Sequence, residues 1–401
     1  MSLLALDPLY GDGDLTLDIF IVVLIKVVAA FAILLVAVML YIWFMRKVIA
    51  DMQNRIGPNR AGPFGVLQTL ADGIKLFFKE QSIPNSADRP VFRLSPYLSI
   101  MPAFLMFCVV PIGPTVSILG EQTYLQVADL PIGALWILAM SGVGVYGIML
   151  AGWASGSKYP LLGSVRATAQ LLSYEAAFGL AVLAALMKAG TLSTHDIVTG
   201  QYDTSWHAMF TDGYWLGTGI VPFVIFLIAA TAETNHPPFD LVEAEQELVG
   251  GFNTEYTGIR FAIFFLAEFM NVITMSAIAV TLFLGGPSGP LIGDADGSFV
   301  NTWLMPIFWF TAKVIALLFV TVWVRASLPR MRYDRLMALG WKYLIEIAIL
   351  WVIVLAAIEV ADQEDWNPLV TTLTAGGIAV FAYTILWLAI PKPGERVEDF
   401  R

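Results

Sequence analysis

Long apolar runs recur along the chain and are separated by shorter segments that carry most of its charges. A run of about 20 apolar residues is long enough to cross a bilayer as a helix. Exposed strands or loops would leave backbone polar groups unsatisfied in lipid. The pattern therefore predicts an all-α polytopic membrane protein with about nine transmembrane helices, at residues 19–47, 96–118, 131–152, 164–189, 214–234, 258–284, 303–325, 341–360 and 368–390.

One apolar segment has the pattern of a helix that lies on the membrane. In FGVLQTLADGIKLFFKE, residues 64–80, apolar side chains recur every three or four positions, and the opposite stripe carries Gln68, Asp72, Lys75 and Lys79. This predicts an interfacial amphipathic helix on the inner membrane surface. Packing against other loops is the alternative, and the flanking basic residues favour the membrane surface.

The basic residues lie on one side of the predicted helices. Nineteen of the 22 Lys and Arg residues fall in alternate loops and the C-terminal tail, and the other three, Lys26, Lys188 and Lys313, lie within apolar runs. The positive-inside rule then places the N-terminus outside and the C-terminus inside. We expect an outer acidic tail at 1–18, a core of eight helices at 19–360 with inner loops 46–95, 152–164, 234–257 and 325–341, and a ninth helix with a short inner tail at 361–401. The first 18 residues contain no Lys or Arg, so we expect no cleavable signal peptide.

Composition limits the chemistry that the chain can perform alone. It is 58% hydrophobic and 13% charged, which excludes a soluble globular protein. Its single cysteine, Cys108, lies in an apolar run, and its three histidines have no metal-binding spacing. We therefore expect no metal site, iron–sulfur cluster or haem in this chain, so any electrons are carried by other subunits.

The stretch AETNHPPFDLVEAEQELVGGFNTEY, residues 232–256, is unusually acidic for such an apolar chain. Asp240 after Pro237-Pro238 is a natural N-cap, with Glu243 completing a capping box. Glu245 and Glu247 have the simple interpretation of a solvated helix face. Because no Lys or Arg is interspersed, a functional role competes with this interpretation; the remaining acids of the stretch are Glu233 and Glu255.

Two further acids lie inside predicted membrane helices, Glu175 and Glu268. An ionisable residue inside a membrane span indicates function unless it forms a structural hydrogen bond to a neighbouring helix. A set of nearby carboxylates repels and titrates as a coupled unit, which suits a proton relay. Cation binding is the competing use, although hard-cation sites usually combine fewer acids with carbonyl and amide oxygens. Lys313 and Glu346, also inside predicted helices, could equally be a structural pair, and the sequence does not decide between this and a functional role.

Two basic segments have several interpretations. Arg55 and Arg60 lie on a loop made rigid by Gly-Pro turns beside the amphipathic segment, where they suit either a polar headgroup with a lipid-embedded tail or lipid phosphate. The segment RASLPRMRYDRLMALGWK, residues 325–342, has the same two interpretations and a third, docking to a soluble partner.

Four blocks together resemble a known family. They are RIGPNRAGPFGVLQTLADGIKLFFKE, GWASGSKYPLLGSVRATAQLLSYE, AETNHPPFDLVEAEQELVGGFNTEYTGIRFAIFFLAEF and RASLPRMRYDRLMALGWK. They resemble the quinone-site membrane subunit of the proton-pumping NADH:quinone oxidoreductase, respiratory complex I, which is its H subunit in bacteria. The resemblance extends over most of the chain.

The resemblance implies a quinone entry chamber and an acidic proton path that couples quinone reduction to proton translocation. Quinone would be the substrate, while NADH, FMN and the iron–sulfur clusters would belong to partner subunits. The implied partners are membrane lipid, the peripheral-arm iron–sulfur and quinone-site subunits, small membrane subunits and antiporter-like subunits, with no nucleic acid, in an energy-transducing membrane, the bacterial plasma membrane. The residues that match the proton path are Glu175, Glu233, Asp240, Glu243, Glu245, Glu247, Glu255 and Glu268, and those that match the quinone chamber are Arg55, Arg60, Asp72, Lys75 and Phe252.

Three features depart from the family pattern. Met45 stands where the family usually has Glu, His236 stands where many members have Arg, and the ninth helix lies beyond the minimal core. His236 exchanges a fixed charge for a side chain that titrates near neutrality. Two other functions remain open: the homologous subunit of a membrane-bound hydrogenase, and a free-standing proton- or ion-coupled transporter, although no internal repeat with paired broken helices is evident.

Overall fold

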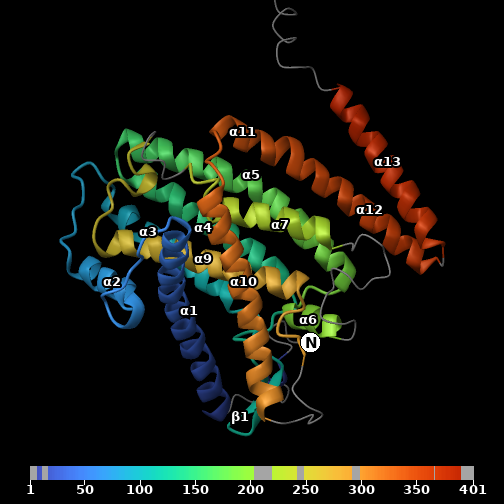
Figure 1. Cartoon of the computed structure of the whole chain (residues 1–401), viewed down its shortest axis with the longest axis horizontal. Helices are drawn as coiled ribbons and strands as arrows, with labels where there is room; N and C mark the ends of the chain where they lie inside the picture. Colours follow the sequence, from blue (N-terminus) through green and yellow to red (C-terminus); the bar gives the residue numbers. More distant parts are fainter. Residues whose placement is uncertain are drawn as a thin grey trace, which may run out of the picture.

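The computed structural model describes residues 7–10, 17–202, 219–241, 248–290, 299–364 and 366–389. It is an all-α polytopic membrane protein, as the apolar runs predict (Figure 1). Within these residues, seven helical runs are long and apolar enough to cross a membrane, and two shorter apolar helices accompany them. The long runs are α1 (Leu17–Met52), α3 (Arg89–Phe107), α4 (Gly133–Ala154), α5 (Lys158–Ala189), α9 (Ile259–Phe283), η4 (Val300–Leu304) with α10 (Met305–Ser327), and α11 (Tyr333–Ala338) with η5 (Leu339–Leu344) and α12 (Ile345–Gln363).

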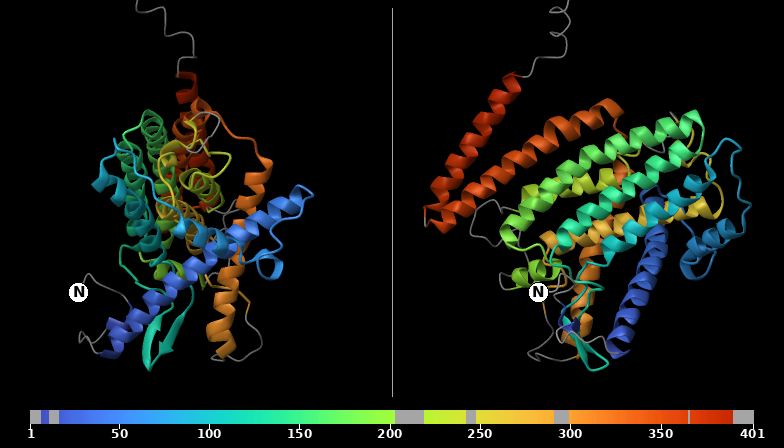
Figure 2. Two further views of the ribbon diagram at one scale, coloured as in Figure 1. Left: turned by 90° about the vertical axis from the view of Figure 1, so that its left-hand side faces the viewer. Right: turned by 180° about the vertical axis from the view of Figure 1, so that it is seen from behind.

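The other two apolar helices are α7 (Ile220–Glu233) and α13 (Pro368–Ala389), whose apolar stretch, Val370–Ile385, is the short part. Each of the nine predicted helices thus has a helical counterpart. Helix α13 packs against α12 and diverges from the rest of the bundle (Figure 1 and the right view of Figure 2). The remaining short elements are η1 (Pro8–Tyr10), η2 (Pro63–Gly65), α2 (Gln68–Phe78), β1 (Thr115–Ile118), β2 (Glu121–Tyr124), α6 (Thr194–Tyr202) and η3 (Gly251–Asn253).

The prediction for the second membrane helix was wrong at both ends. Helix α3 begins at Arg89, with Pro90 in its first turn, and ends at Phe107. Proline suits the first turn of a helix, where the amide hydrogens have no partner in the helix. Residues 108–118, predicted to be helical, instead lead into an antiparallel hairpin in which Thr115 pairs with Tyr124. Pro111 and Pro114 lack the amide donors that a continuing helix needs.

Helix α9 lies in the middle of the bundle, and 16 of its 25 residues are buried. It packs against α1, α3, α7 and α10. Helix α5 packs against α4, α7 and α12, so the predicted acids on α5 and α9 lie on the two most enclosed helices. The chain approaches itself closely between α5 and η3, where Gly163 faces the backbone of Gly251.

Two lysines within apolar runs have structural partners. The Lys26 ammonium donates to Asp7, just before η1, and to Thr123 of β2 at 2.8 Å each, which joins both to α1. The Lys313 ammonium donates to the carbonyls of Leu284, Gly286 and Ser288, just beyond the C-terminus of α9. A cation at a helix C-terminus satisfies carbonyls that have no partner in the helix. Lys313 thus has a structural role, but its partners are these carbonyls and not Glu346, the alternative that the sequence left open.

The hairpin end of the molecule contains a second set of titratable residues. Ser193 donates to Asp129 at 3.0 Å, and the His195 ring stacks on Tyr124 at 3.6 Å between centroids. Burial, with a smaller contribution from the charges of Asp196 and Asp7, raises the pKa of Asp129 to about 6. Asp129 is thus held in an environment that favours its protonated form.

Replacing Gly163 by Ala is expected to destabilise the protein by about 1–3 kcal/mol, because the new Cβ would lie 2.8 Å from the Gly251 Cα and force backbone movement. The midpoint of thermal aggregation of the purified complex measures the effect. Gly179→Ala on the same helix is the control, since its Cβ would meet nothing nearer than Leu138 at 4.0 Å. Equal midpoints for the two variants would show that α5 and η3 can move apart enough to accommodate the extra methyl group at little cost.

Replacing Asp129 by Asn is expected to raise the free energy of unfolding at pH 7.5 by about 2 kcal/mol. The folded-state pKa of about 6 exceeds the unfolded value near 4, so the wild-type protein loses stability as pH rises between these values. The gain should therefore shrink as the pH falls from about 6 to about 4 and disappear only below about pH 4. Thermal midpoints measured from pH 3.5 to 8 test this, and a variant less stable than wild type at pH 7.5 would contradict it.

Candidate functional site: a buried carboxylate cavity

Two of the predicted acids, Glu233 and Glu175, contact neighbouring residues of helix α4. Helix α7 ends at Glu233, four residues before Pro237, and the Glu233 carboxylate accepts a hydrogen bond from the Ser141 hydroxyl. Glu175 of α5 lies against the next residue, since a Cβ on Gly142 would stand 2.9 Å from its Oε1. The two carboxylates are close enough for their charges to interact. Small residues on α4 thus allow two acids from different helices to approach.

A cavity of about 60 Å³ lies beside Glu233 and also reaches Glu268 of α9. A water molecule needs roughly 10–15 Å³ of such volume, so the cavity accommodates a few waters. Pockets for small organic ligands are typically about 300–1,000 Å³. The cavity therefore suits water and not a quinone ring. Its lining residues come from α3, α4, α5, the end of α7, η3 and α9.

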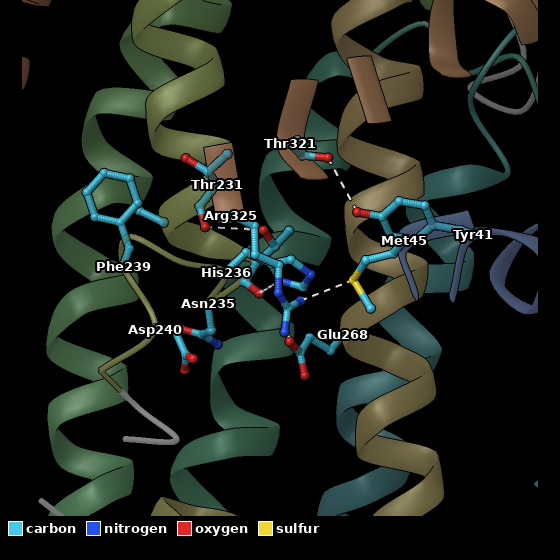
Figure 3. Close-up of polar contacts among 12 residues, drawn as sticks. Tyr41, Met45, Thr231, Asn235, His236, Phe239, Asp240, Glu268, Thr321 and Arg325 are labelled. Atoms are coloured by element: carbon cyan, nitrogen blue, oxygen red, sulfur yellow. Dashed lines mark hydrogen bonds and ion pairs between the residues drawn. The ribbon is translucent and has the colours of Figure 1, made fainter. Parts of the chain in front are cut away.

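His236 connects the acidic loop to Glu268 (Figure 3). Its Nδ1 lies 2.9 Å from the Thr234 carbonyl oxygen and 3.3 Å from Glu268 Oε1. A carbonyl can only accept, so Nδ1 carries a hydrogen and donates it to Thr234, while the Glu268 carboxylate lies within ion-pair distance of the same nitrogen. The imidazole is buried and stands edge-on to Phe269 at 5.5 Å. The histidine whose role the sequence left open thus contacts an acid in the membrane interior.

Arg325 of α10 contacts Met45, the other residue that departs from the family pattern, beside His236. Its Nη1 lies 3.4 Å from the Met45 sulfur, and its charge acts on both His236 and Tyr41. Figure 3 shows Met45, Arg325, His236 and Glu268 gathered in one polar cluster. The two unusual residues, from α1 and from the loop after α7, therefore share one electrostatic environment.

The loop after α7 is held by side chains from elsewhere in the chain. Gln170 of α5 donates its amide to the carbonyls of Ala232 at 2.9 Å and Phe239 at 3.0 Å. Arg330 donates to Asp240 at 2.8 Å, and the backbone amide of Met331 donates to the Pro238 carbonyl. Two inner segments predicted as separate chamber loops, 234–257 and 325–341, are thus in direct contact.

The remaining acids of the stretch are placed differently. Asp240, predicted to be an N-cap, binds Arg330, and its predicted partner Glu243 lies outside the described residues, as do Glu245 and Glu247. Glu255 is half-buried in the loop after η3. The structure thus brings Glu175, Glu233 and Glu268 to the region of the cavity and does not test the middle of the acidic loop.

The residues predicted for the quinone chamber do not form one group. Phe252 is buried, lines the carboxylate cavity and packs edge-on against Phe264 at 5.3 Å. Arg55, Arg60 and Lys75 are exposed, and Arg55 donates to Gln53 at 2.7 Å. Phe252 therefore belongs to the interior, and the three basic residues belong to the surface.

Helix α2 has the predicted amphipathic pattern. Leu70, Ile74 and Phe77 form an exposed apolar stripe. On the other side, Asp72 binds Arg46 of α1 at 2.8 Å. Although partial burial raises the pKa of Asp72, its hydrogen bond to Arg46 and the Arg46 charge together bring that pKa below the usual value. Asp72 thus joins α2 to α1, and the position of α2 on the membrane surface remains a prediction.

Three residues of the site carry signals that the sequence interpretation missed. Ser141 and Gly142 interrupt an apolar helix, and Gln170 is a buried amide on α5. Polar and small residues in membrane helices indicate helix–helix contacts, but only the structure identifies their partners. Among the described residues, no three His, Cys, Asp or Glu side chains form a group that could hold a metal ion.

The chain is similar to known sequences over most of its length. The sequence model of the NADH dehydrogenase family matches residues 25–356. The H subunit of the NADH-quinone oxidoreductase of Frankia casuarinae is 49% identical over 393 residues, covering 97% of this chain and 83% of the relative. The H subunit of the Frankia alni enzyme is 50% identical over 386 residues, covering 96% of this chain and 82% of the relative.

The chain belongs to the NADH dehydrogenase family, together with these two H subunits. The resemblance inferred from the four sequence blocks is thereby confirmed. The match to the family model stops at residue 356, before α13 begins at Pro368. The alignment to the Frankia casuarinae protein covers 97% of the chain and so includes most of α13. The ninth helix therefore has a counterpart in that relative although it lies beyond the family model.

Replacing Gln170 by Leu is expected to lower the free energy of local unfolding of the loop at 234–241 by about 1–3 kcal/mol. The reason is that the carbonyls of Ala232 and Phe239 lose their buried hydrogen-bond donor. Hydrogen–deuterium exchange of peptides covering 232–241 should then become faster. Gln201→Leu is the matched control, since Gln201 donates to the Leu282 carbonyl at the C-terminal end of α9. Unchanged exchange in the Gln170 variant would show that Gln170 does not hold the loop.

Proposed function

We propose that this chain, the H-type membrane subunit of an NADH-quinone oxidoreductase, couples quinone reduction to proton translocation through its buried carboxylates. The observation that carries the proposal is the convergence of Glu233 and Glu268 on one water-sized cavity, with Glu175 beside Glu233. The chain would act within the enzyme complex, with the redox centres for NADH oxidation on partner subunits.

Mutual repulsion is the physical basis of the coupling. Two carboxylates about 7 Å apart at an effective dielectric near 20 repel by roughly 2.4 kcal/mol. Each ionisation therefore makes the next more costly, and the acids share protons as a coupled unit. A change of charge at the quinone would change the free energy of ionising these acids and so redistribute the protons among them. His236 lies 3.3 Å from Glu268, and the charge of Arg325 acts on that histidine.

The acidic loop would extend the path toward the quinone. In this proposal Asp240, Glu243, Glu245, Glu247 and Glu255 continue the route from the cavity into the inner loop. Arg55, Arg60, Asp72 and Lys75 would line the chamber entrance beside α2, whose exposed apolar stripe suits the membrane surface. Because the internal cavity is too small for quinone, the headgroup would lie between this chain and a partner subunit. Phe252 would act at the cavity instead of at the entrance.

The placement in the cell follows the same reasoning. The apolar helices make the chain an integral membrane protein, and the charge distribution favours an outer N-terminus and an inner C-terminus in a bacterial plasma membrane. The inner loops would meet the peripheral-arm subunits, and the helices would meet small membrane subunits and antiporter-like subunits. The two Frankia relatives, both named as parts of an NADH-quinone oxidoreductase, favour this assignment over a hydrogenase subunit or a free-standing transporter.

Replacing Glu175 or Glu268 by Gln is expected to reduce both NADH:quinone activity and proton pumping at least tenfold, since a proton-carrying group typically contributes about 10²–10⁴-fold. Assembly of the complex should persist, because Gln keeps the size and hydrogen-bonding capacity of the side chain. NADH oxidation with a water-soluble acceptor reports on assembly independently of quinone.

The matched control is Glu364→Gln, at the exposed end of α12, which should retain both activities. Full activity and full pumping in both the Glu175 and the Glu268 variants would remove the proposed proton path. Loss of pumping with normal quinone reduction would leave the path in place and show that electron transfer is not obligatorily coupled to it.

A further inference from the structure

The carboxylate cavity is lined by polar atoms that have no hydrogen-bond partner among the described residues. They are Ser99 Oγ from α3, Glu233 Oε2 from the end of α7 and Asn271 Oδ1 from α9. Ser99 is only 7% exposed. Buried polar atoms are almost always paired, because an unpaired one loses its interaction with water without compensation. Three such atoms on one cavity therefore indicate an occupant that pairs with them.

The hydrogen-bonding capacities of these atoms match a water molecule. A carboxylate oxygen and an amide oxygen only accept, whereas the serine hydroxyl can donate. One water that donates to Glu233 and Asn271 and accepts from Ser99 would satisfy all three atoms. The cavity of about 60 Å³ has room for further waters that extend this contact.

The same cavity reaches the second carboxylate. Asn271 follows Glu268 by three residues on α9, so the two side chains lie on one face of the helix. Both residues line the cavity together with Glu233. Water held at Asn271 and Ser99 would therefore lie between an acid of α9 and an acid at the end of α7. Gly147 of α4 provides the space for Ser99, since any Cβ at this position would collide with the Ser99 hydroxyl.

We propose that Asn271 and Ser99 are positioning residues that hold an ordered water bridge between Glu268 and Glu233. The inference rests on the proposed proton path and adds the connection by which a proton passes between its two cavity carboxylates. Protonated Glu268 releases its proton to the bridging water as that water passes one of its own protons to the Glu233 carboxylate. Glu268 is then ionised, Glu233 is protonated and the water is unchanged, so no further reactant is required.

The test replaces the side chains that hold the water and leaves both carboxylates in place. Asn271→Leu removes the acceptor and fills its space, and it should lower NADH:quinone activity and pumping at least tenfold. Ser99→Ala should lower them about three- to tenfold. Asn271→Ser restores an oxygen with room for one more water and should recover most of the activity. In Ser99→Ala the solvent deuterium isotope effect on turnover should rise, because proton transfer becomes rate-limiting.

Thr274→Val is the matched control. Thr274 is also buried on α9, and its hydroxyl oxygen likewise has no partner among the described residues, but it does not line the cavity. Its activity and isotope effect should stay within twofold of wild type. An equal loss in this variant would attribute the Asn271 effect to general disturbance of α9 and overturn the inference.

Other outcomes separate this inference from the proposed function. If Glu268→Gln is inactive while Asn271→Leu and Ser99→Ala turn over with normal rates and isotope effects, the water bridge is wrong and the proton path stands. If Asn271→Leu fails to assemble, the Ser99→Ala isotope effect decides alone, and a wild-type value overturns the bridge. Turnover that depends on sodium concentration would identify a cation as the occupant and would also overturn it.

Discussion

The cost of placing carboxylates inside an apolar helix bundle is the constraint on which the structure of this site depends. An acid at this depth persists only when hydrogen bonds or counter-charges compensate for the loss of water. Glu233 receives the Ser141 hydroxyl, and Glu268 lies against the His236 imidazole with the Arg325 charge close to that histidine. These partners come from α4, the loop after α7 and α10, so the acids are maintained by the packing of several helices.

Small residues make this packing possible. Gly142 admits the Glu175 carboxylate, Gly147 leaves room for Ser99, and Gly163 lets α5 meet η3 at backbone distance. In membranes the hydrophobic effect does not drive helices together, because lipid is as apolar as their side chains. Association depends instead on close packing, which small side chains allow. Of these three glycines, Gly147 also affects the cavity, because it leaves room for Ser99, which lines it.

The departures from the family pattern make sense when they are considered together. Met45 and His236 are 191 positions apart in the chain, yet Arg325 connects their surroundings. A family position that usually carries a negative charge and one that often carries a positive charge have both become uncharged or titratable here. If Glu and Arg stood at these positions, as the resemblance implies for the family, their charges would sum to zero, and so do those of Met45 and a neutral His236.

The sequence by itself determined the class of the protein, the helices and the family, because apolar runs, turn residues and long motifs are local properties. It failed at 108–118, where prolines end a run that remains apolar, and it grouped Phe252 with surface residues. Only the tertiary structure decided which acids meet. Ser141 and Glu233 are 92 positions apart, and Gln170 and Phe239 are 69 apart. Such contacts depend on how helices pack, and helix packing is set by the whole bundle and not by any one segment.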